Sequence, residues 1–172
     1  MEATTYPLPK NTFEVNVETM AVIAEKDDCG EMYTKVIQVK DEFSVGMRPL
    51  AIIEKSCRYF GSSLKGRQDG TREITGFTHK APVAIDPASG IYMFPTLSPY
   101  KEECSWLSHS YIKQLEAMDA YRTKIVFLND KEVILNVSKG SFENQLHRTA
   151  QFRFLLSEKI KSLTFAGVKE PG

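Results

Sequence analysis

Hydrophobic residues in the first quarter of the chain recur at roughly every second position, which predicts β-strands. Residues 12–26 and 32–45 mix β-branched and aromatic residues with polar ones in this way, and the polar residues 27–30 separate them. Because successive side chains of a strand point to opposite faces, Val36 and Ile37 are expected on opposite faces of one strand. We therefore predict one or two strands, a turn and a further strand over this region.

The pattern changes to a helical period after residue 48. Four apolar residues are spaced by three, four and three positions and would line one face of a helix: Leu50, Ile53, Cys57 and Phe60. Pro49 suits the first turn of this helix, and Gly61 suits its end. The glycine-rich and polar residues 61–72 are predicted to form a loop or a broken short helix.

Two hairpins are predicted in the second half of the chain. Residues 81–96 contain a turn at 86–90, and residues 123–137 form two β-rich runs around an Asn-Asp pair. Residues 105–118, between the two hairpins, fit a strand and a helix equally well.

A long helix is predicted near residues 141–163, with Ser141 as its N-terminal cap. Its apolar stripe consists of Phe142, Leu146, Ala150, Leu156, Ile160 and Leu163. Phe152 and Phe154 lie off the centre of this stripe. These extra aromatic residues indicate a wide apolar surface, suited to self-association or to packing on a second element.

These elements predict an α+β fold: a mostly antiparallel sheet with hairpins, one helix near 49–60 and a long C-terminal helix near 141–163. We expect residues 12–163 to form a single domain, preceded by a loose arm at residues 1–11 and followed by a short tail at residues 164–172. The 172 residues are 42% hydrophobic and 26% charged, which is enough for one buried core.

Charge is distributed unevenly along the chain, although the formal net charge is zero. Residues 48–80 carry seven bases and three acids, a net charge of +4, and residues 139–172 carry six bases and three acids, a net charge of +3. Residues 1–47 and 81–138 have net charges of −5 and −2. A neutral protein whose two basic segments lie together has a basic face that can bind a polyanion.

The N-terminal sequence and the number of cysteines indicate the cellular compartment. No basic segment followed by an apolar stretch stands at the start, and no apolar run approaches the roughly 20 residues of a membrane helix. Three cysteines, an odd number, indicate reduced thiols rather than a disulfide framework. We therefore expect a cytoplasmic protein without membrane contact.

The segment 57–72, rich in glycine, serine and cations, is the strongest candidate site. Gly61 and Gly66 have the spacing of a P-loop, but Arg67 and Gln68 stand where that loop needs a lysine and a hydroxyl, which disfavours nucleotide binding. A DNA contact fits better, because arginines on a small-residue loop can reach phosphates or a narrow minor groove. An ordinary solvated turn fits the spacing equally well. The candidate DNA-binding residues are Arg58, Lys65, Arg67, Arg72 and Lys80. A second group depends on how the helices lie beside this segment: Arg48, Lys55, Arg148 and Arg153.

Side chains of the types that bind zinc occur at Cys57, His79, Cys104 and His109. Cys104 and His109 are spaced like a ligand pair, but the chain has no CxxC motif, and Cys57 also fits the buried face of its helix. We assign no metal and no cofactor, and zinc stays an open alternative. The chain contains no local signature of a nucleophilic or metal-dependent enzyme, so we expect no catalytic activity.

Several longer stretches resemble the ComK family of competence transcription factors of Gram-positive bacteria. They are KSCRYFGSSLKGRQDGT, THKAPVAIDP, MFPTLS, CSWLSH and SFENQLHRTAQ, and the resemblance spans residues 13–160. It implies a sequence-specific DNA-binding activator of competence (DNA-uptake) genes. Such an activator recognises paired AT-rich boxes in double-stranded DNA, largely through the minor groove. It binds as a homodimer or higher oligomer and is associated with the nucleoid when bound.

One departure from the family keeps an alternative open. Longer members continue past the last helix with a tail that a protease adaptor grips, whereas this chain ends at Gly172 without a comparable tail. The adaptor contact is therefore placed in doubt. Together with the zero net charge and the wide apolar helix, this motivates the alternative of a non-DNA-binding paralogue that modulates a full-length activator by forming mixed oligomers.

Overall fold

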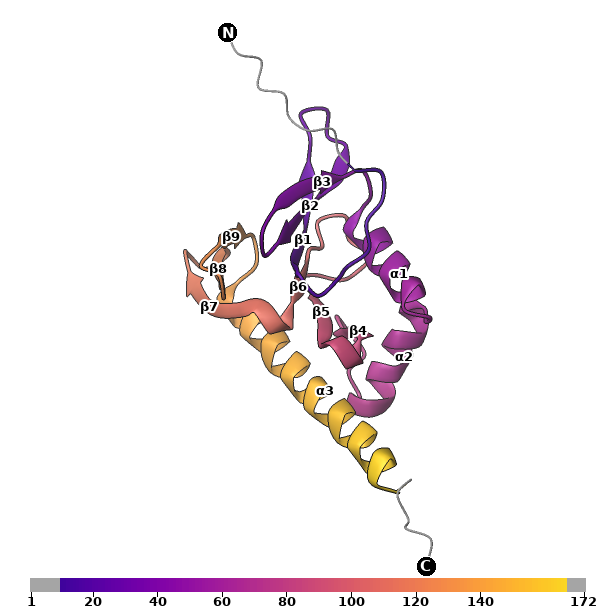
Figure 1. The fold of residues 1–172 in the computed structure, drawn as a ribbon. Coiled ribbons are helices and arrows are strands. Elements are labelled where there is room, and N and C mark those ends of the chain that lie inside the picture. Colours follow the sequence, from indigo (N-terminus) through magenta and orange to yellow (C-terminus); the bar gives the residue numbers. More distant parts are fainter. Residues whose placement is uncertain (1–9, 167–172) are drawn as a thin grey trace, which may run out of the picture.

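A six-stranded antiparallel sheet, here called sheet A, lies at the centre of the computed structural model, which describes residues 10–166 (Figure 1). Its strands, in spatial order, are β3 (Glu42–Val45), β2 (Met32–Gln38), β1 (Thr19–Lys26), β6 (Trp106–Ser108), β5 (Ile91–Pro95) and β4 (Val83–Asp86). A three-stranded antiparallel sheet, here called sheet B, consists of β7 (Ile112–Ala117), β8 (Thr123–Phe127) and β9 (Glu132–Leu135). The predicted α+β class with antiparallel hairpins is confirmed.

Two helices, α1 (Pro49–Tyr59) and α2 (Leu64–Thr75), cover one face of sheet A (Figure 1). Ile52 and Ile53 of α1 and Val36 of β2 belong to the core between them. Ile37, the next residue of β2, belongs to the core on the opposite face. The predicted alternation along this strand is confirmed, and both faces of the central sheet are buried.

Sheet B and the first half of α3 (Lys139–Ala166) cover the other face of sheet A. Phe142 of α3, Phe127 of β8 and Phe94 of β5 share this second core. The helix then passes β5 and lies beside α2 (Figure 1). The long C-terminal helix is confirmed, and no helix of residues 10–166 is both long enough and apolar enough to span a bilayer.

Two details predicted for this last helix are wrong. The helix begins at Lys139, and the backbone N–H of Ser141 donates to Ser138 Oγ at 3.3 Å, so Ser138 is the capping residue rather than Ser141. The buried stripe also differs from the predicted one, since Ala150 is exposed. The fully buried positions in the first half of the helix are Phe142, Gln145, Thr149 and Phe152. Two of these are polar, and a stripe defined by apolar residues alone could not include them.

Residues 61–72, predicted to form a loop or a broken short helix, belong largely to the continuous helix α2. Ser63 caps α2, because its Oγ accepts a hydrogen bond from the backbone N–H of Gly66 at 3.0 Å. Two glycines inside the helix cost about 1 kcal/mol each relative to alanine, which obscures the helical pattern. Packing compensates for this cost: Leu64 and Thr71 are buried, and Thr71 Oγ1 donates to the carbonyl of Pro82 at 2.8 Å.

The remaining elements settle the ambiguous segment. Residues 105–118 form β6, a short 3-10 turn (His109–Tyr111) and β7, so the strand alternative holds. Both predicted hairpins are present as β4–β5 and β8–β9. Residues 1–9 of the expected arm and residues 167–172 of the expected tail lie outside the described part of the chain.

Candidate nucleic-acid interface

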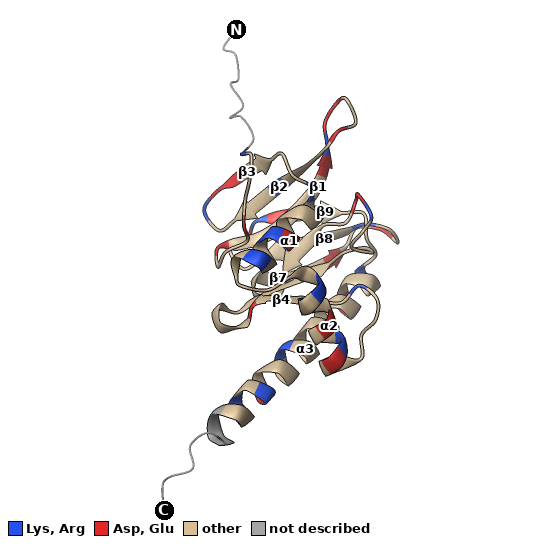
Figure 2. Ribbon diagram, turned by 90° about the vertical axis from the view of Figure 1, so that its right-hand side faces the viewer, with Lys and Arg blue, Asp and Glu red and all other residues tan. Residues whose placement is uncertain are grey.

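The predicted DNA-binding residues Arg58, Lys65, Arg67, Arg72 and Lys80 lie on α1, on α2 and in the connection from α2 to β4. Figure 2 looks onto the side of the molecule that carries α1 and α2, and Lys and Arg segments appear on both helices. Arg58 is in the last turn of α1 and Arg72 in the last turn of α2. Cations at these positions favourably oppose the negative ends of the helix dipoles.

Ion pairing divides the nine candidates into two groups. Acidic partners hold three of them: Arg48 pairs with Glu102 at 3.1 Å, Lys55 with Glu14 at 3.4 Å and Lys65 with Asp69 at 2.7 Å. The hydrogen bond from Lys65 is the main cause that lowers the pKa of Asp69, so this carboxylate stays ionised. Within residues 10–166 the other six have no acidic partner: Arg58, Arg67, Arg72, Lys80, Arg148 and Arg153. Contact between any of these six and a polyanion would therefore break no ion pair among the described residues.

Arg67 is less accessible than a residue on a free loop would be. It lies on the inner side of α2 and is partly buried, and its Nε has no hydrogen-bond partner among the described residues. Burial raises the pKa of both Cys57 and Tyr92, and the positive charge of Arg67 offsets part of each rise, which places the guanidinium between α1 and β5. Part of this side chain is therefore structural, and only its outer end can face a ligand.

Residues 76–80, which follow α2, form a sharp turn that α3 braces; we call this segment the 76–80 turn. Arg148 of α3 donates through Nη2 to the carbonyl of His79 at 2.6 Å, and its guanidinium carbon lies 4.3 Å from the ring centroid of Phe77. Gln145 Nε2 donates to the carbonyl of Lys80 at 2.9 Å and to that of Pro95 at 2.9 Å. The last helix therefore lies against the basic segment 48–80, an arrangement that the sequence alone did not decide.

Arg153 has a different environment. Its Nη1 donates to Ser110 Oγ at 2.8 Å and lies 3.4 Å from His109 Nδ1, and its guanidinium stacks over the Tyr92 ring at 4.9 Å. Burial, and secondarily the Arg153 charge, lowers the pKa of His109, so the imidazole is neutral at pH 7. Arg153 connects α3 to β5 and to the 3-10 turn, and these contacts occupy its guanidinium.

The residues considered for zinc are not brought together. The part of the chain from residue 10 to 166 contains no group of three or more His, Cys, Asp or Glu side chains placed to hold a metal ion. Cys57 and Cys104 are buried in the core beneath α1, and burial raises the pKa of the Cys57 thiol to about 11. His79 lies on the exposed 76–80 turn, and His109 lies beside Arg153.

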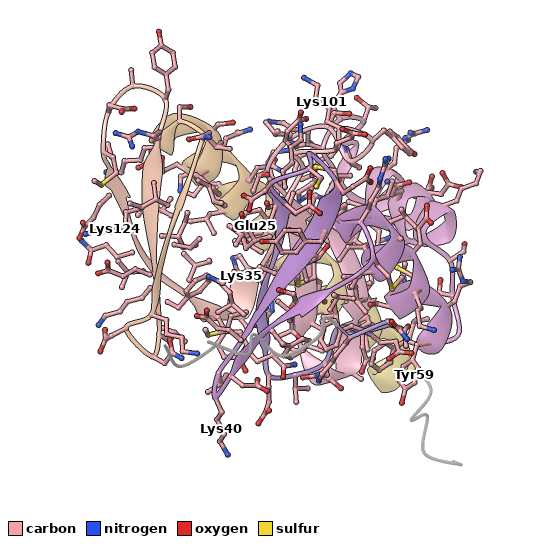
Figure 3. All side chains as sticks on the ribbon, turned by 90° about the horizontal axis from the view of Figure 1, so that it is seen from above. Glu25, Lys35, Lys40, Tyr59, Lys101 and Lys124 are labelled. Carbon is pink, nitrogen blue, oxygen red and sulfur yellow. The ribbon has the colours of Figure 1, made fainter. Side chains whose placement is uncertain are left out.

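Aromatic side chains flank the basic face and were not selected from the sequence. Tyr59, which follows Arg58, projects outward and is 69% exposed (Figure 3). Tyr100 is 75% exposed and lines a groove together with Arg72, Lys80 and the acidic Asp69. Exposed tyrosines beside arginines are a recognisable signal for stacking on nucleic acid, but Tyr100 is far from Arg72 in the sequence and only the fold pairs them.

One face of this α+β domain carries exposed aromatic side chains and cations that have no acidic partner among the described residues. These are the physical features of the class of nucleic-acid-binding proteins. The profile of the ComK protein family matches residues 10–161. The competence transcription factor of Bacillus subtilis (strain 168) is 42% identical over 152 residues, which cover 88% of this chain and 79% of that protein. No solved structure matches the chain significantly. The chain belongs to the ComK family.

Proposed function

We propose that this protein is a DNA-binding transcriptional activator of competence genes, which recognises paired AT-rich boxes largely through the minor groove. The observation that carries the proposal is the 42% identity to a competence transcription factor over 88% of the chain. Identity of this extent over one domain makes a shared biochemical activity the simplest hypothesis. A protein with this role would act in the cytoplasm and would associate with the nucleoid.

The distribution of free cations supports the same proposal. Arg58, Arg72 and Lys80 lie on α1, α2 and the 76–80 turn without an acidic partner in the described chain. Phosphate contacts of this kind orient a protein on the duplex and give little base specificity. Selection of AT-rich DNA then comes from the shape of its narrow minor groove and from its deformability.

Paired boxes imply a symmetric assembly. Two-fold symmetry in a protein matches two half-sites at a fixed spacing, so we propose a homodimer or higher oligomer as the bound form. The end of α3 offers apolar surface for such an assembly, since Phe154 and Leu163 are 63% and 76% exposed.

A fluorescence anisotropy titration tests the proposal. One duplex carries paired A-tract and T-tract boxes, a GC-rich duplex of equal length is the control, and both are titrated at two salt concentrations. We expect tighter binding to the AT duplex that persists at the higher salt. Equal binding to both duplexes that disappears with salt would reduce the activity to phosphate contact alone.

A second candidate is a paralogue that does not bind DNA and that modulates a full-length activator through mixed oligomers. The exposed apolar end of α3 favours it, because Phe154 and Leu163 give a surface that a related chain could cover. Gel filtration of a mixture with the Bacillus subtilis relative checks this candidate. A mixed species, combined with no binding to either duplex, would favour the modulator; separate elution of the two proteins would eliminate it.

A further inference from the structure

The 76–80 turn has a fixed backbone although its tip is exposed. Gly76 ends α2 in the left-handed conformation with φ 79°, and Lys80 has a positive φ of 47°. A lysine in this conformation is unfavourable and persists only where surrounding contacts hold it. Those contacts come from α3: Gln145 binds the carbonyl of Lys80, and Arg148 binds the carbonyl of His79.

The bracing leaves the tip of the turn free. Thr78 and His79 are exposed, whereas Phe77 is partly covered by the Arg148 guanidinium. Two cations without an acidic partner among the described residues flank the tip: Arg72 on α2 and, at the end of the turn, Lys80, whose Nζ lies 3.4 Å from Ser141 Oγ. An exposed tip on a rigid support is pre-organised, so little conformational entropy is lost when it binds.

Size decides which element of this face can enter a minor groove. An α-helix with its side chains is about 10–12 Å across, whereas the minor groove of B-DNA is about 6 Å wide. Neither α1 nor α2 therefore fits, and only the turns between elements are narrow enough. Of the two turns that adjoin α2, residues 60–63 use their N–H groups and the Ser63 hydroxyl to end α1 and to cap α2. The 76–80 turn presents free polar side chains instead.

We propose that the 76–80 turn is the element that enters the minor groove of AT-rich DNA, with Thr78 and His79 at the base edges. Arg72 and Lys80 contact the phosphates on either side of the groove, and Arg148 is a positioning residue that holds the turn. This assignment rests on the proposed DNA-binding function and adds to it the groove-entering element.

A negative charge introduced at the tip of the turn tests the assignment through the affinity for DNA. His79→Glu should weaken binding to the duplex with paired A-tract and T-tract boxes by about tenfold or more, because a carboxylate between two phosphate strands is repelled. Ala120→Glu, on the exposed β7–β8 turn of sheet B, is the matched control and should stay within about twofold of the parent. Equal affinities for the two variants would overturn the assignment.

Directed cleavage of the DNA tests the same assignment, because it shows where the 76–80 turn lies on the duplex. An iron chelate attached to His79→Cys in a Cys29→Ser background should cleave both strands inside the boxes, with the 3′-displaced pattern of a minor-groove probe. The Cys29→Ser substitution removes the exposed cysteine, and the remaining Cys57 and Cys104 are buried. The chelate is therefore attached only at the introduced cysteine. Thr78→Cys carries the chelate if the first variant binds poorly.

The variant used for comparison is Ser62→Cys, which places the chelate in the 60–63 turn between α1 and α2. Cleavage from residue 62 and none from residues 78 or 79 would overturn the assignment and leave the DNA-binding function intact. Failure of the parent chain to bind the AT duplex would overturn the proposed function itself. The two failures are therefore distinguished by the unmodified protein.

Discussion

Arg72→Ala isolates one predicted phosphate contact. Arg72 is exposed and has no ion pair within residues 10–166, and its part in ending α2 is made by its backbone carbonyl, which accepts from Gly76 N–H at 2.7 Å. The substitution should therefore change the free energy of unfolding by less than about 0.5 kcal/mol. Any loss of DNA affinity would then come from the interface and not from the fold.

The magnitude follows from counterion release. One phosphate contact fewer changes the slope of log K against log salt by about 0.9, which at about 0.1 M salt corresponds to binding weaker by about eightfold, or about 1.2 kcal/mol. The matched control is Lys55→Ala, because Glu14 already neutralises Lys55 at 3.4 Å. We expect the control to leave the slope unchanged and the affinity within about twofold of the parent.

The assay is an anisotropy titration of the AT duplex at four salt concentrations, with a urea unfolding curve for each variant. Two results would refute the reasoning: an unchanged slope for Arg72→Ala, or an equal loss of slope for Lys55→Ala. The first would remove Arg72 from the interface. The second would show that ion pairing in the free protein does not decide which cations meet DNA.

Three further predictions concern the support of the site. Thr71→Val leaves the Pro82 carbonyl without its 2.8 Å hydrogen bond, so urea unfolding should show a loss of about 1–3 kcal/mol; a change below about 0.5 kcal/mol would contradict the role of this contact. Arg148→Lys keeps the charge but not the planar contacts to His79 and its neighbours, so AT-duplex affinity should fall as far as in Arg148→Ala with an unchanged salt slope. Retention of parent affinity by the lysine variant would make Arg148 a phosphate contact instead. Because burial raises the folded-state pKa of Cys57 from 9.0 to about 11, the protein should lose stability as pH rises between these values, and Cys57→Ala should make this fall shallower in unfolding curves across that range. An equally steep fall in both proteins would disprove the linkage.

The sequence predicted those elements whose pattern is local. The hairpins, α1 and the long α3 were found because alternating or helical spacing of apolar residues reports which face of an element is buried. Pro49 and Gly61 marked the two ends of α1 correctly. The motifs of the ComK family were visible at the same stage, since they are contiguous stretches of chain.

Helix α2 was predicted only as one of two alternatives, a loop or a broken short helix, because two different signals compete within it. Gly66 and Gly70 have low helix propensity, and the inward face of α2 includes a charged residue, Arg67, and a hydroxyl residue, Thr71. Burial of this polar face is favourable only in the folded protein, where Thr71 donates a hydrogen bond to the carbonyl of Pro82 on a neighbouring segment. The same reason explains the polar stripe of α3, where Gln145 is buried against two carbonyls that lie far away in the sequence.

Sequence alone determined the class of fold, the basic segments and the candidate cations, because periodicity and charge are properties of the chain itself. The tertiary structure decided which of those cations remain free, since Glu14, Glu102 and Asp69 reach three of them. It also decided that α3 braces the 76–80 turn, through Arg148 and Gln145. Such pairings depend on distances between segments that are remote along the chain, and the chain acquires those distances only when its hydrophobic faces pack together.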